Sequence, residues 1–192
     1  YLDTNAYAND ETAQFLGRIF RNSPTIEFPD NSAGLRLSLL PSELFDIELG
    51  ILDADADWED AFDSVFLGGQ INFRPKLLDR EGNYRILGWL NDRNHTKWLD
   101  TAKDKEEGYG FGLSFDQELT DYLGAFLRYG WQDPEVYLTG SSFSLEQSWS
   151  TGLQIKGGLW RRENDILGLA VGQAIPSDDY KKADATRNAR KE

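Results

Sequence analysis

The 192-residue sequence contains no cysteine and no methionine, and its single histidine is His95. The absence of cysteine excludes disulfide scaffolds, thiolate zinc sites and thiol catalysis. One histidine is too few for a metal site built from several imidazoles. Basic residues are also scarce, because 20 lysines and arginines face 33 aspartates and glutamates, giving a net charge of −13. That excess of acid argues against binding to nucleic-acid phosphates, so no nucleic-acid partner is expected.

Long hydrophobic runs are missing as well. No run of about 18 apolar residues occurs, so the sequence encodes no transmembrane helix. A transmembrane strand needs only about 9–11 residues with every second one apolar, so a membrane protein is still compatible with this sequence. The 6 tryptophans, 8 tyrosines and 11 phenylalanines are too many for a disordered acidic chain. No signal peptide stands at the start, so for an exported protein it is expected to be already removed or to lie outside this segment.

From residue 32 onward the dominant period of hydrophobicity is two residues, which predicts β-strands. In segment 45–51, for example, Phe, Ile, Leu and Ile alternate with Asp, Glu and Gly. Eight such segments have about the length of a tilted membrane strand, and no crossover helix separates them, so antiparallel neighbours are expected. The predicted strands are 33–39, 45–51, 65–74, 84–93, 109–116, 123–132, 150–159 and 167–174.

The sequence predicts an all-β fold, an antiparallel transmembrane β-barrel with one short N-terminal helix. The whole chain, residues 1–192, is expected to form a single partial barrel domain. Residues 1–31 form a loop with the helix, residues 32–176 carry the eight strands, and residues 177–192 form an extracellular loop or tail. Asp10 can cap the helix, which should stop before proline 24, and its apolar face would consist of Phe15, Leu16, Ile19 and Phe20.

Tight and long connections alternate between the predicted strands. The tight ones lie near residues 41–44, 77–83, 118–122 and 161–165, and the long ones span residues 54–62, 95–107 and 133–147. Outer-membrane barrels keep such an alternation, with short periplasmic turns and longer external loops. A soluble β-sandwich or a small β-barrel that binds a ligand is the alternative interpretation, although neither has a reason to alternate its loops. His95 falls in a long loop and is expected to be exposed.

The barrel interpretation places the apolar face on lipid and the charged, glycine-rich face around a water-filled passage. Arginine and carboxylate groups can hydrogen-bond the hydroxyls of uncharged sugars, and aromatic rings can cover the apolar face of a pyranose. Each charged candidate could instead hold the wall as an ion pair, and Trp89 could pack against an inward loop or the helix. The candidate channel-lining residues are Arg36, Glu48, Arg74, Arg85, Trp89, Arg93, Arg128 and Lys156.

An acidic stretch in one long loop, with Asp53, Asp55 and Asp57, resembles a calcium-binding loop at first sight. An EF-hand needs glycine at its sixth position and glutamate at its twelfth, where this chain has Trp58 and Ser64. A hydrated acidic loop is therefore the favoured interpretation, and these aspartates are only a weak candidate for Ca²⁺. No cofactor is otherwise expected.

Three carboxylates, Asp46, Glu48 and Asp116, share the predicted polar face, as a glycosidase pair would require. Carboxylates on a solvent-exposed face of a strand are usually hydrated and have no catalytic role. The sequence therefore predicts no enzyme, and transport through a channel needs no catalyst.

Several stretches resemble carbohydrate-selective porins of the OprB type. Residues 108–131, GYGFGLSFDQELTDYLGAFLRYGW, resemble a hairpin of that family, as do residues 158–172, GLWRRENDILGLAVG, followed by Ser-Asp-Asp-Tyr at 177–180. NAYAND at 5–10 and Leu-Arg-Leu at 35–37 are similar to the middle of such porins.

The resemblance implies an outer-membrane porin of about sixteen strands through which small saccharides diffuse. Its partners would be saccharides, the lipid bilayer and lipopolysaccharide, and association into homotrimers is left open. About half of such a barrel is present, without the family's N-terminal strands and without a closing strand that ends in an aromatic residue. The chain is therefore expected to be a fragment of the middle-to-C-terminal part.

Overall fold

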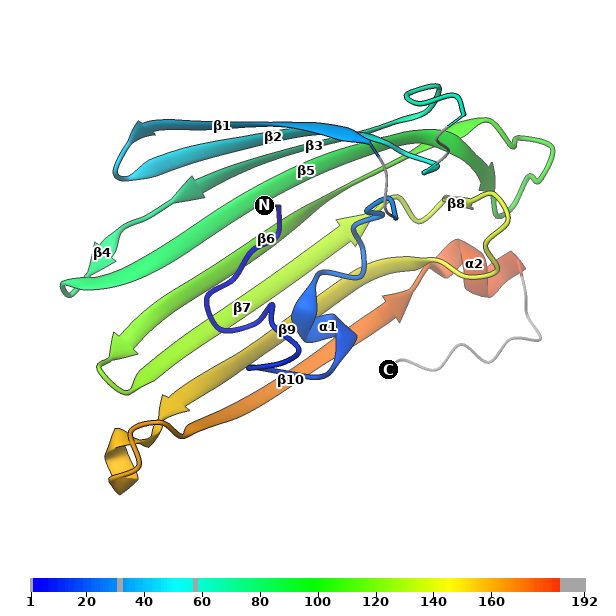
Figure 1. Cartoon of the computed structure of the whole chain (residues 1–192). Helices are drawn as coiled ribbons and strands as arrows, with labels where there is room; N and C mark the ends of the chain where they lie inside the picture. Colours follow the sequence, from blue (N-terminus) through cyan, green and yellow to red (C-terminus); the bar gives the residue numbers. More distant parts are fainter. Residues whose placement is uncertain (1, 31–32, 57–58, 184–192) are drawn as a thin grey trace.

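The computed structural model describes residues 2–30, 33–56 and 59–183. In this part of the chain one curved antiparallel sheet dominates, and its long strands pair in chain order (Figure 1). This arrangement confirms the predicted all-β antiparallel architecture. The long strands are β1 (Gly34–Ser42), β2 (Phe45–Asp53), β3 (Val65–Phe73), β5 (Arg80–Lys97), β6 (Glu106–Thr120), β7 (Leu123–Gln132), β9 (Leu145–Lys156) and β10 (Ile166–Pro176).

Two short strands, β4 (Lys76–Leu77) and β8 (Val136–Leu138), pair with β5 beside the main sheet. Within the described residues the sheet is open, with β1 at one edge and β10 at the other. In Figure 1 the tight connections gather at one end of the strands and the long ones at the other. The alternation of connections read from the sequence therefore corresponds to the two ends of the sheet.

Several strand boundaries differ from the sequence-based expectation. β5 continues to Lys97 and β6 already begins at Glu106, so the loop between them is shorter than predicted. The expectation that His95 lies in an exposed loop is therefore wrong. β9 ends at Lys156, and the next residues form a 3-10 turn, η1 (Gly157–Trp160). The turn needs glycine at 157, because a Cβ atom there would lie less than 3.0 Å from the main-chain oxygen of Arg162.

The apolar side chains of the strands lie on the convex face, where they are largely exposed. Leu37 is 51% exposed and Leu153 is 39% exposed. The buried apolar cluster lies on the opposite, concave face, around Phe66 and Trp89. In the described residues the apolar face therefore forms no dry interior, as a lipid-facing surface requires. None of the described helices has the length and apolar character needed to cross a membrane.

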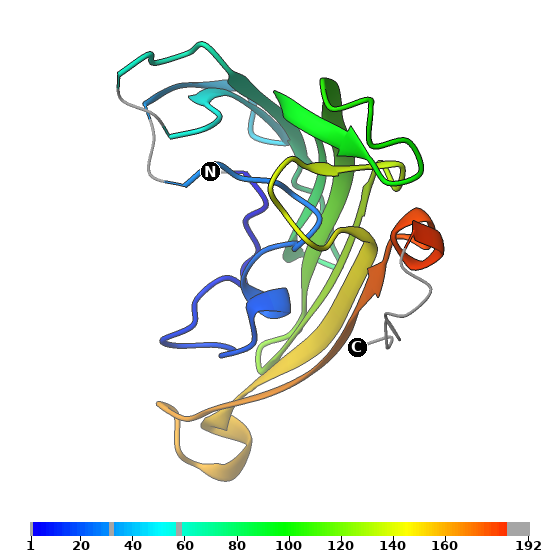
Figure 2. The same ribbon diagram turned by 90° about the vertical axis from the view of Figure 1, so that its right-hand side faces the viewer.

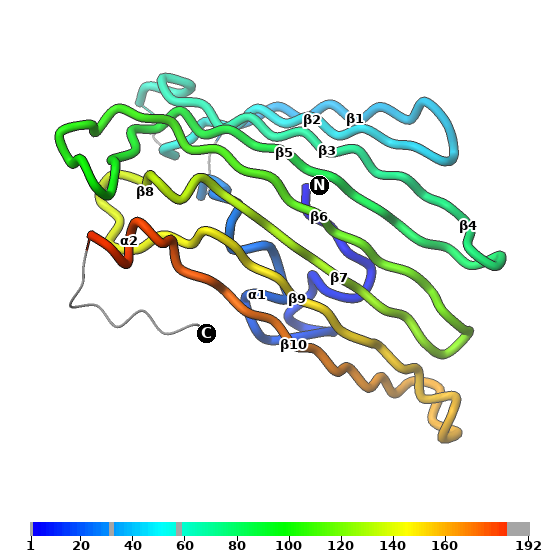
Figure 3. Tube along the Cα trace, turned by 180° about the vertical axis from the view of Figure 1, so that it is seen from behind, coloured from blue at the N-terminus to red at the C-terminus, as the bar shows by residue number. Residues whose placement is uncertain are grey.

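The concave face is covered in its middle by residues 2–30, which we call the inner segment. Figure 2 shows it inside the curve of the sheet, and in the view from behind (Figure 3) the strands lie in front of it. Its helix, α1 (Arg18–Arg21), is shorter than predicted. The Asp10 carboxylate accepts hydrogen bonds from the main-chain N–H and the hydroxyl of Thr12, so it closes a local turn instead of capping a helix.

After β10 the chain forms a second helix, α2 (Asp178–Ala183), where a loop or tail was expected. The hydroxyl of Ser177 accepts a hydrogen bond from the Tyr180 N–H and caps the helix. The Tyr180 ring packs edge-on against Trp98 and Phe143, with ring centres 5.0 and 5.2 Å apart. This aromatic cluster fixes α2 against the loops at the end of the sheet with long connections. Residues 184–192 of the predicted tail lie outside the described residues.

Candidate functional site

The concave wall binds the inner segment through hydrogen bonds that span much of the sheet. On β3, Gln70 accepts a hydrogen bond of 2.9 Å from the Asp3 N–H. On β6, the Ser114 hydroxyl donates one of 2.9 Å to the Thr4 carbonyl. On β9, the Ser148 hydroxyl lies 3.2 Å from a hydroxyl of the inner segment. Because the partners sit on three strands, the inner segment is attached across the wall.

Arg128 on β7 is the main anchor of the inner segment, and it is only 2% exposed. Its guanidinium donates hydrogen bonds of 2.9 Å to the Phe20 carbonyl and 3.2 Å to the Arg21 carbonyl. It also donates one of 3.0 Å to the Asp3 carbonyl and one of 2.7 Å to Oδ1 of Asn9. A planar group with five fixed donors suits this task, since the oxygens come from three places in one irregular segment.

The Asp3 carboxylate is the counter-ion of this anchor. Its Oδ1 lies 3.6 Å from Nε of Arg128, and its Oδ2 accepts a hydrogen bond of 2.6 Å from the Ser23 N–H. Burial raises the pKa of Asp3, because desolvation of the carboxylate outweighs the attraction of Arg128 and the Ser23 hydrogen bond. A buried ion pair of this kind fixes the position of both groups, and removal of one partner destabilises the fold because the other charge stays buried without compensation.

A second buried ion pair joins two strands next to the first. Arg85 on β5 binds the Asp116 carboxylate on β6. The same carboxylate accepts hydrogen bonds from the Asn83 amide, at 2.8 Å, and from the Ala6 N–H of the inner segment, at 3.2 Å. Arg85 and Asp116 therefore hold both the wall and the inner segment.

Trp89 on β5 lies in the buried apolar cluster of the concave face. Its ring is nearly parallel to that of Phe66 on β3, with ring centres 5.9 Å apart. Ile26 of the inner segment belongs to the same cluster, and Phe28 packs against its edge. The structure thus places Trp89 beneath the inner segment, which was the alternative weighed for this residue.

Glycines of the concave face make room for the inner segment. A methyl group on Gly130 of β7 would lie less than 3.0 Å from the hydroxyls of both Thr25 and Ser23. The same applies to Gly124 and the ring of Tyr7. Gly68 lies under Leu2 and Gly168 under Phe15 in the same way. The sequence predicts that the glycine-rich face lines a channel. In the structure, these glycines of that face contact the inner segment.

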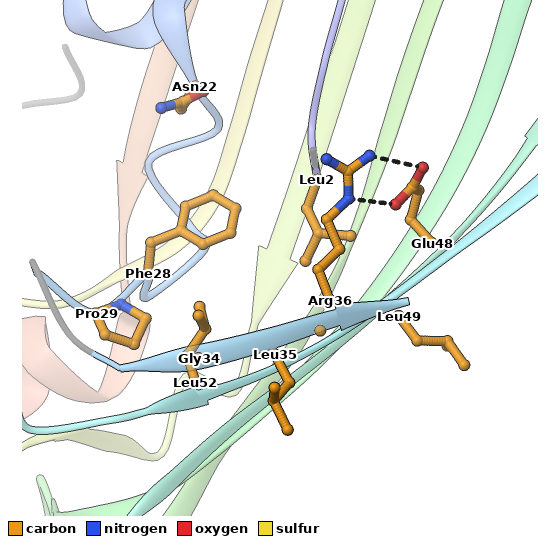
Figure 4. A pocket seen from close by; sticks show the side chains of 11 residues that line it. Leu2, Asn22, Phe28, Pro29, Gly34, Leu35, Arg36, Glu48, Leu49 and Leu52 are labelled. Carbon is orange, nitrogen blue, oxygen red and sulfur yellow. Dashed lines mark hydrogen bonds and ion pairs between the residues drawn. The ribbon is translucent and has the colours of Figure 1, made fainter. Parts of the chain in front are cut away.

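Near the β1 edge, the inner segment leaves part of the wall open. Arg36 on β1 makes a two-pronged ion pair with Glu48 on β2, at 2.7 and 2.9 Å, and the Ser38 hydroxyl donates a further hydrogen bond of 2.7 Å to Glu48. The pair borders a cavity of about 500 Å³. Figure 4 shows it across from Phe28. The lining residues are Leu2, Asn22, Phe28, Pro29, Gly34, Leu35, Arg36, Glu48, Leu49, Gly50 and Leu52.

The other predicted lining residues lie apart from this cavity. Arg74 follows β3 and binds the Asp46 carboxylate at 3.1 Å, near the end of the sheet with tight turns. Lys156 closes β9 at the same end and is exposed. Arg93 is half-buried toward the other end of β5. The structure therefore separates the eight candidates into a covered group, Arg85, Trp89 and Arg128, and five more accessible residues.

The acidic loop brings together Asp53, Asp55 and Asp63, whose carboxylate oxygens lie within 4.8 Å of one another. Asp53 is buried and accepts a hydrogen bond of 2.9 Å from the Phe62 N–H, which fixes the loop. Asp57, the third residue of the predicted set, lies outside the described residues. A calcium ion at this loop stays a prediction.

The three carboxylates weighed as glycosidase groups do not form a catalytic pair. Asp46 binds Arg74, Glu48 binds Arg36, and Asp116 binds Arg85. Because each carboxylate is held by its own arginine, none is arranged as a proton donor beside a nucleophile.

Several residues of this site were not singled out from the sequence. Asp3, Asn9 and Glu27 belong to the inner segment, and their partners on the wall lie more than 60 positions away. The NAYAND stretch, which contains Asn9, resembles part of the porin family but carries no pattern that predicts these contacts. A usable signal was present in the spacing of glycines on the polar face, which marks the places where other chain atoms approach closely.

The comparisons with known proteins agree with this geometry. The sequence profile described as carbohydrate-selective porin, OprB family, matches residues 2–192. An uncharacterized protein of Aquifex aeolicus (strain VF5) is 29% identical over 198 residues, covering 98% of this chain and 57% of that protein. Porin AaxA of Chlamydia muridarum is 22% identical over 176 residues, covering 88% of this chain and 35% of the porin.

A solved structure, described as the high pH structure of Pseudomonas putida OprB, superposes with a TM-score of 0.69. Its sequence identity is 17%, and the match covers 88% of this chain and 45% of that one, so the likeness shows the fold. The chain thus spans about half the length, or less, of the relatives that it matches.

Proposed function

Because the chain belongs to the carbohydrate-selective porin family, OprB, we propose that it forms part of the wall of an outer-membrane channel through which small saccharides diffuse passively. The observation that carries the proposal is the orientation of the sheet. The apolar side chains lie on the convex face, while the charged residues and the inner segment lie on the concave face. A barrel wall in lipid needs this arrangement, and a soluble domain needs the opposite one.

The inner segment is proposed to narrow the passage. It lies inside the curve of the wall and is held there by Arg128, by Asp116 paired with Arg85, and by the cluster around Trp89. These three residues, predicted to contact solute, would then act by holding the inner segment. A fixed obstacle inside a wide barrel sets the size of the solute that can pass.

The five accessible candidates, Arg36, Glu48, Arg74, Arg93 and Lys156, are proposed to face the solute. Arg36 and Glu48 are the best placed, because they border the cavity in Figure 4 opposite an aromatic ring, Phe28. A sugar presents hydroxyls to charged groups and a C–H face to an aromatic ring. Weak contacts of both kinds let a solute enter without being trapped.

The proposed location is the bacterial outer membrane, with bilayer lipids and lipopolysaccharide around the convex face. The end of the sheet with long connections would face the cell exterior, as in other barrels of this class. Homotrimers are part of the proposal only through the resemblance of the chain to porins. Channels of this family perform no covalent chemistry, which fits the prediction that the protein is not an enzyme.

Liposome swelling tests the proposal. The complete protein that contains this chain is inserted into liposomes, and swelling is recorded in mono-, di- and trisaccharide solutions. We expect rates that fall with saccharide size and exceed those of protein-free liposomes. A protein that inserts but admits no saccharide would overturn the substrate assignment.

The soluble alternative has a separate test. A ligand-binding sandwich or small barrel would stay monomeric in buffer without detergent, whereas a barrel wall would aggregate. The exposed apolar side chains on the convex face, such as Leu37 and Leu153, favour the second outcome.

A further inference from the structure

The only histidine of the chain is buried at a joint between the wall and the inner segment. His95 on β5 is 0% exposed. Its backbone lies between β6 and β8, opposite Glu106 and Leu138. Its ring lies against Gly108, where a methyl group would come within 3.0 Å of the imidazole. The backbone of His95 is thus paired on both sides, and its ring has Gly108 as a close neighbour.

Both ring nitrogens of His95 face oxygen atoms, one of a main-chain carbonyl, which can only accept a hydrogen bond, and one of a carboxylate, which accepts as long as it is ionised. Nδ1 lies 2.6 Å from the main-chain oxygen of Arg93, and Nε2 lies 2.8 Å from Oε2 of Glu27. A neutral imidazole has one N–H, so its other nitrogen would direct a lone pair at an oxygen. The geometry therefore requires one further proton, carried by an imidazolium beside a carboxylate or shared between His95 and Glu27.

Neighbouring groups favour the ionised form of Glu27 beside the His95 ring. The Asn91 amide donates a hydrogen bond of 3.1 Å to the same Glu27 oxygen and so favours the carboxylate form. The nearby charges are Arg93, which opposes a cation, and Glu106 on β6, whose backbone stands opposite His95 in the register. Lys97 is engaged by Glu135 at 3.1 Å, and β8 (Val136–Leu138) contributes no charged side chain.

We propose that protonated His95 is a positioning residue, which binds Glu27 and so holds the inner segment against the wall. We call this His95–Glu27 pair the clasp, and we propose that it opens as pH rises. When the ring loses its proton, one of its two hydrogen bonds is replaced by lone-pair repulsion, and the Glu27 carboxylate loses its cation. Glu27 lies next to Ile26 in the chain, and Ile26 packs in the cluster of Trp89. Release of Glu27 would therefore loosen that part of the inner segment.

The consequence for transport rests on the proposed function, because opening of the clasp widens the passage only if the inner segment narrows it. In that case saccharide flux rises with pH. The clasp can be tested without transport, since the chain has no cysteine to interfere with an introduced one.

The probe is the complete protein with Ile26→Cys, made free of any other cysteine. Labelling by a charged thiol reagent is measured in lipid vesicles between mildly acidic and alkaline pH. Each rate is divided by that of an exposed reference, Ser142→Cys, because thiol ionisation itself depends on pH. Loss of a charge-assisted hydrogen bond predicts a relative labelling rate that rises by about tenfold or more.

Two further variants show which groups cause the rise. Glu27→Gln replaces the carboxylate with an amide that can face a neutral ring with its N–H, so labelling should stay slow at alkaline pH. Glu135→Gln is the matched control, a neighbouring exposed carboxylate whose loss should leave the pH profile unchanged.

A flat profile in the parent, or a rise that persists in Glu27→Gln, would overturn the clasp. A rise abolished by Glu27→Gln supports it, whatever the flux. Saccharide flux that stays constant while labelling rises would instead contradict the narrowing role of the inner segment.

Discussion

Oδ1 of Asn9 accepts a hydrogen bond of 2.7 Å from the Arg128 guanidinium, although the two residues are 119 positions apart. Through this contact a loop at the start of the chain is fixed to the middle of strand β7. The same guanidinium reaches the carbonyls of Asp3 and Phe20, so one side chain defines the path of the inner segment. The concave face is therefore built together with the segment that covers it.

Replacing this anchor should release the inner segment while the sheet stays intact. Arg128→Ala removes the donor to Asn9 and leaves the Asp3 carboxylate buried without its cation. Removal of one partner of such a pair lowers the stability of the folded state by about 3–5 kcal/mol. Thiol labelling of Ala8→Cys, a buried position, should then become faster. The control is Arg161→Ala in an exposed turn, which should leave labelling slow. Equal labelling in both variants would refute the anchoring role.

The fit between glycines and the inner segment gives a second prediction. Gly130→Val would push against the Thr25 and Ser23 hydroxyls, and overpacking of this kind costs about 1–3 kcal/mol. We expect faster labelling of Ala8→Cys and faster saccharide uptake. Gly88→Val is the matched control, because a Cβ atom there has no neighbour within 4 Å. If both valines had the same effect, strand propensity and not the fit to the inner segment would be the cause.

The Arg36–Glu48 pair should contribute to saccharide passage. Arg36→Met keeps the length of the side chain but removes its hydrogen-bond donors, and we expect saccharide affinity to fall by about two- to tenfold. The affinity is measured from sugar-induced blocking of ion current in planar bilayers. The double reversal Arg36→Glu with Glu48→Arg should recover much of the loss, whereas Arg162→Met, an exposed turn residue, should have no effect. A reversal no better than Arg36→Met would argue against the pair.

The strands and their faces could be predicted because both depend on local alternation of side chains. Segments such as 45–51 and 123–132 carry that period clearly, and the structure places strands there. The predictions were wrong where contacts between remote parts of the chain determine the structure. His95 lies in the last part of β5, where the alternation has faded after residue 93, and its ring contacts Glu27, 68 positions away.

The inner segment shows the same limit for the candidate site. Outside the short apolar helix face near residues 15–20, its residues have no helical or strand period, so local pattern predicts only a loop with a helix. Whether that loop covers Arg128 and Trp89 depends on ion pairs and close packing between remote parts of the chain. Charged residues on the polar face could thus be predicted as a group, but their division into anchors and accessible residues follows from contacts with a remote part of the chain.

The orientation of the sheet gives the last prediction, since two neighbouring residues of β9 face opposite sides. Leu153 points to the convex face three residues before the end of the strand at Lys156, and Gln154 points to the concave face. Leu153→Arg should destabilise the protein in lipid by up to about 4 kcal/mol, because it places a charge among the lipid tails, where the cost rises toward the bilayer centre. Gln154→Arg should destabilise the protein much less, since its charge would lie on the hydrated concave face. Urea unfolding in lipid vesicles measures both. Equal losses would mean that the convex face does not contact lipid, and the porin proposal would fail with it.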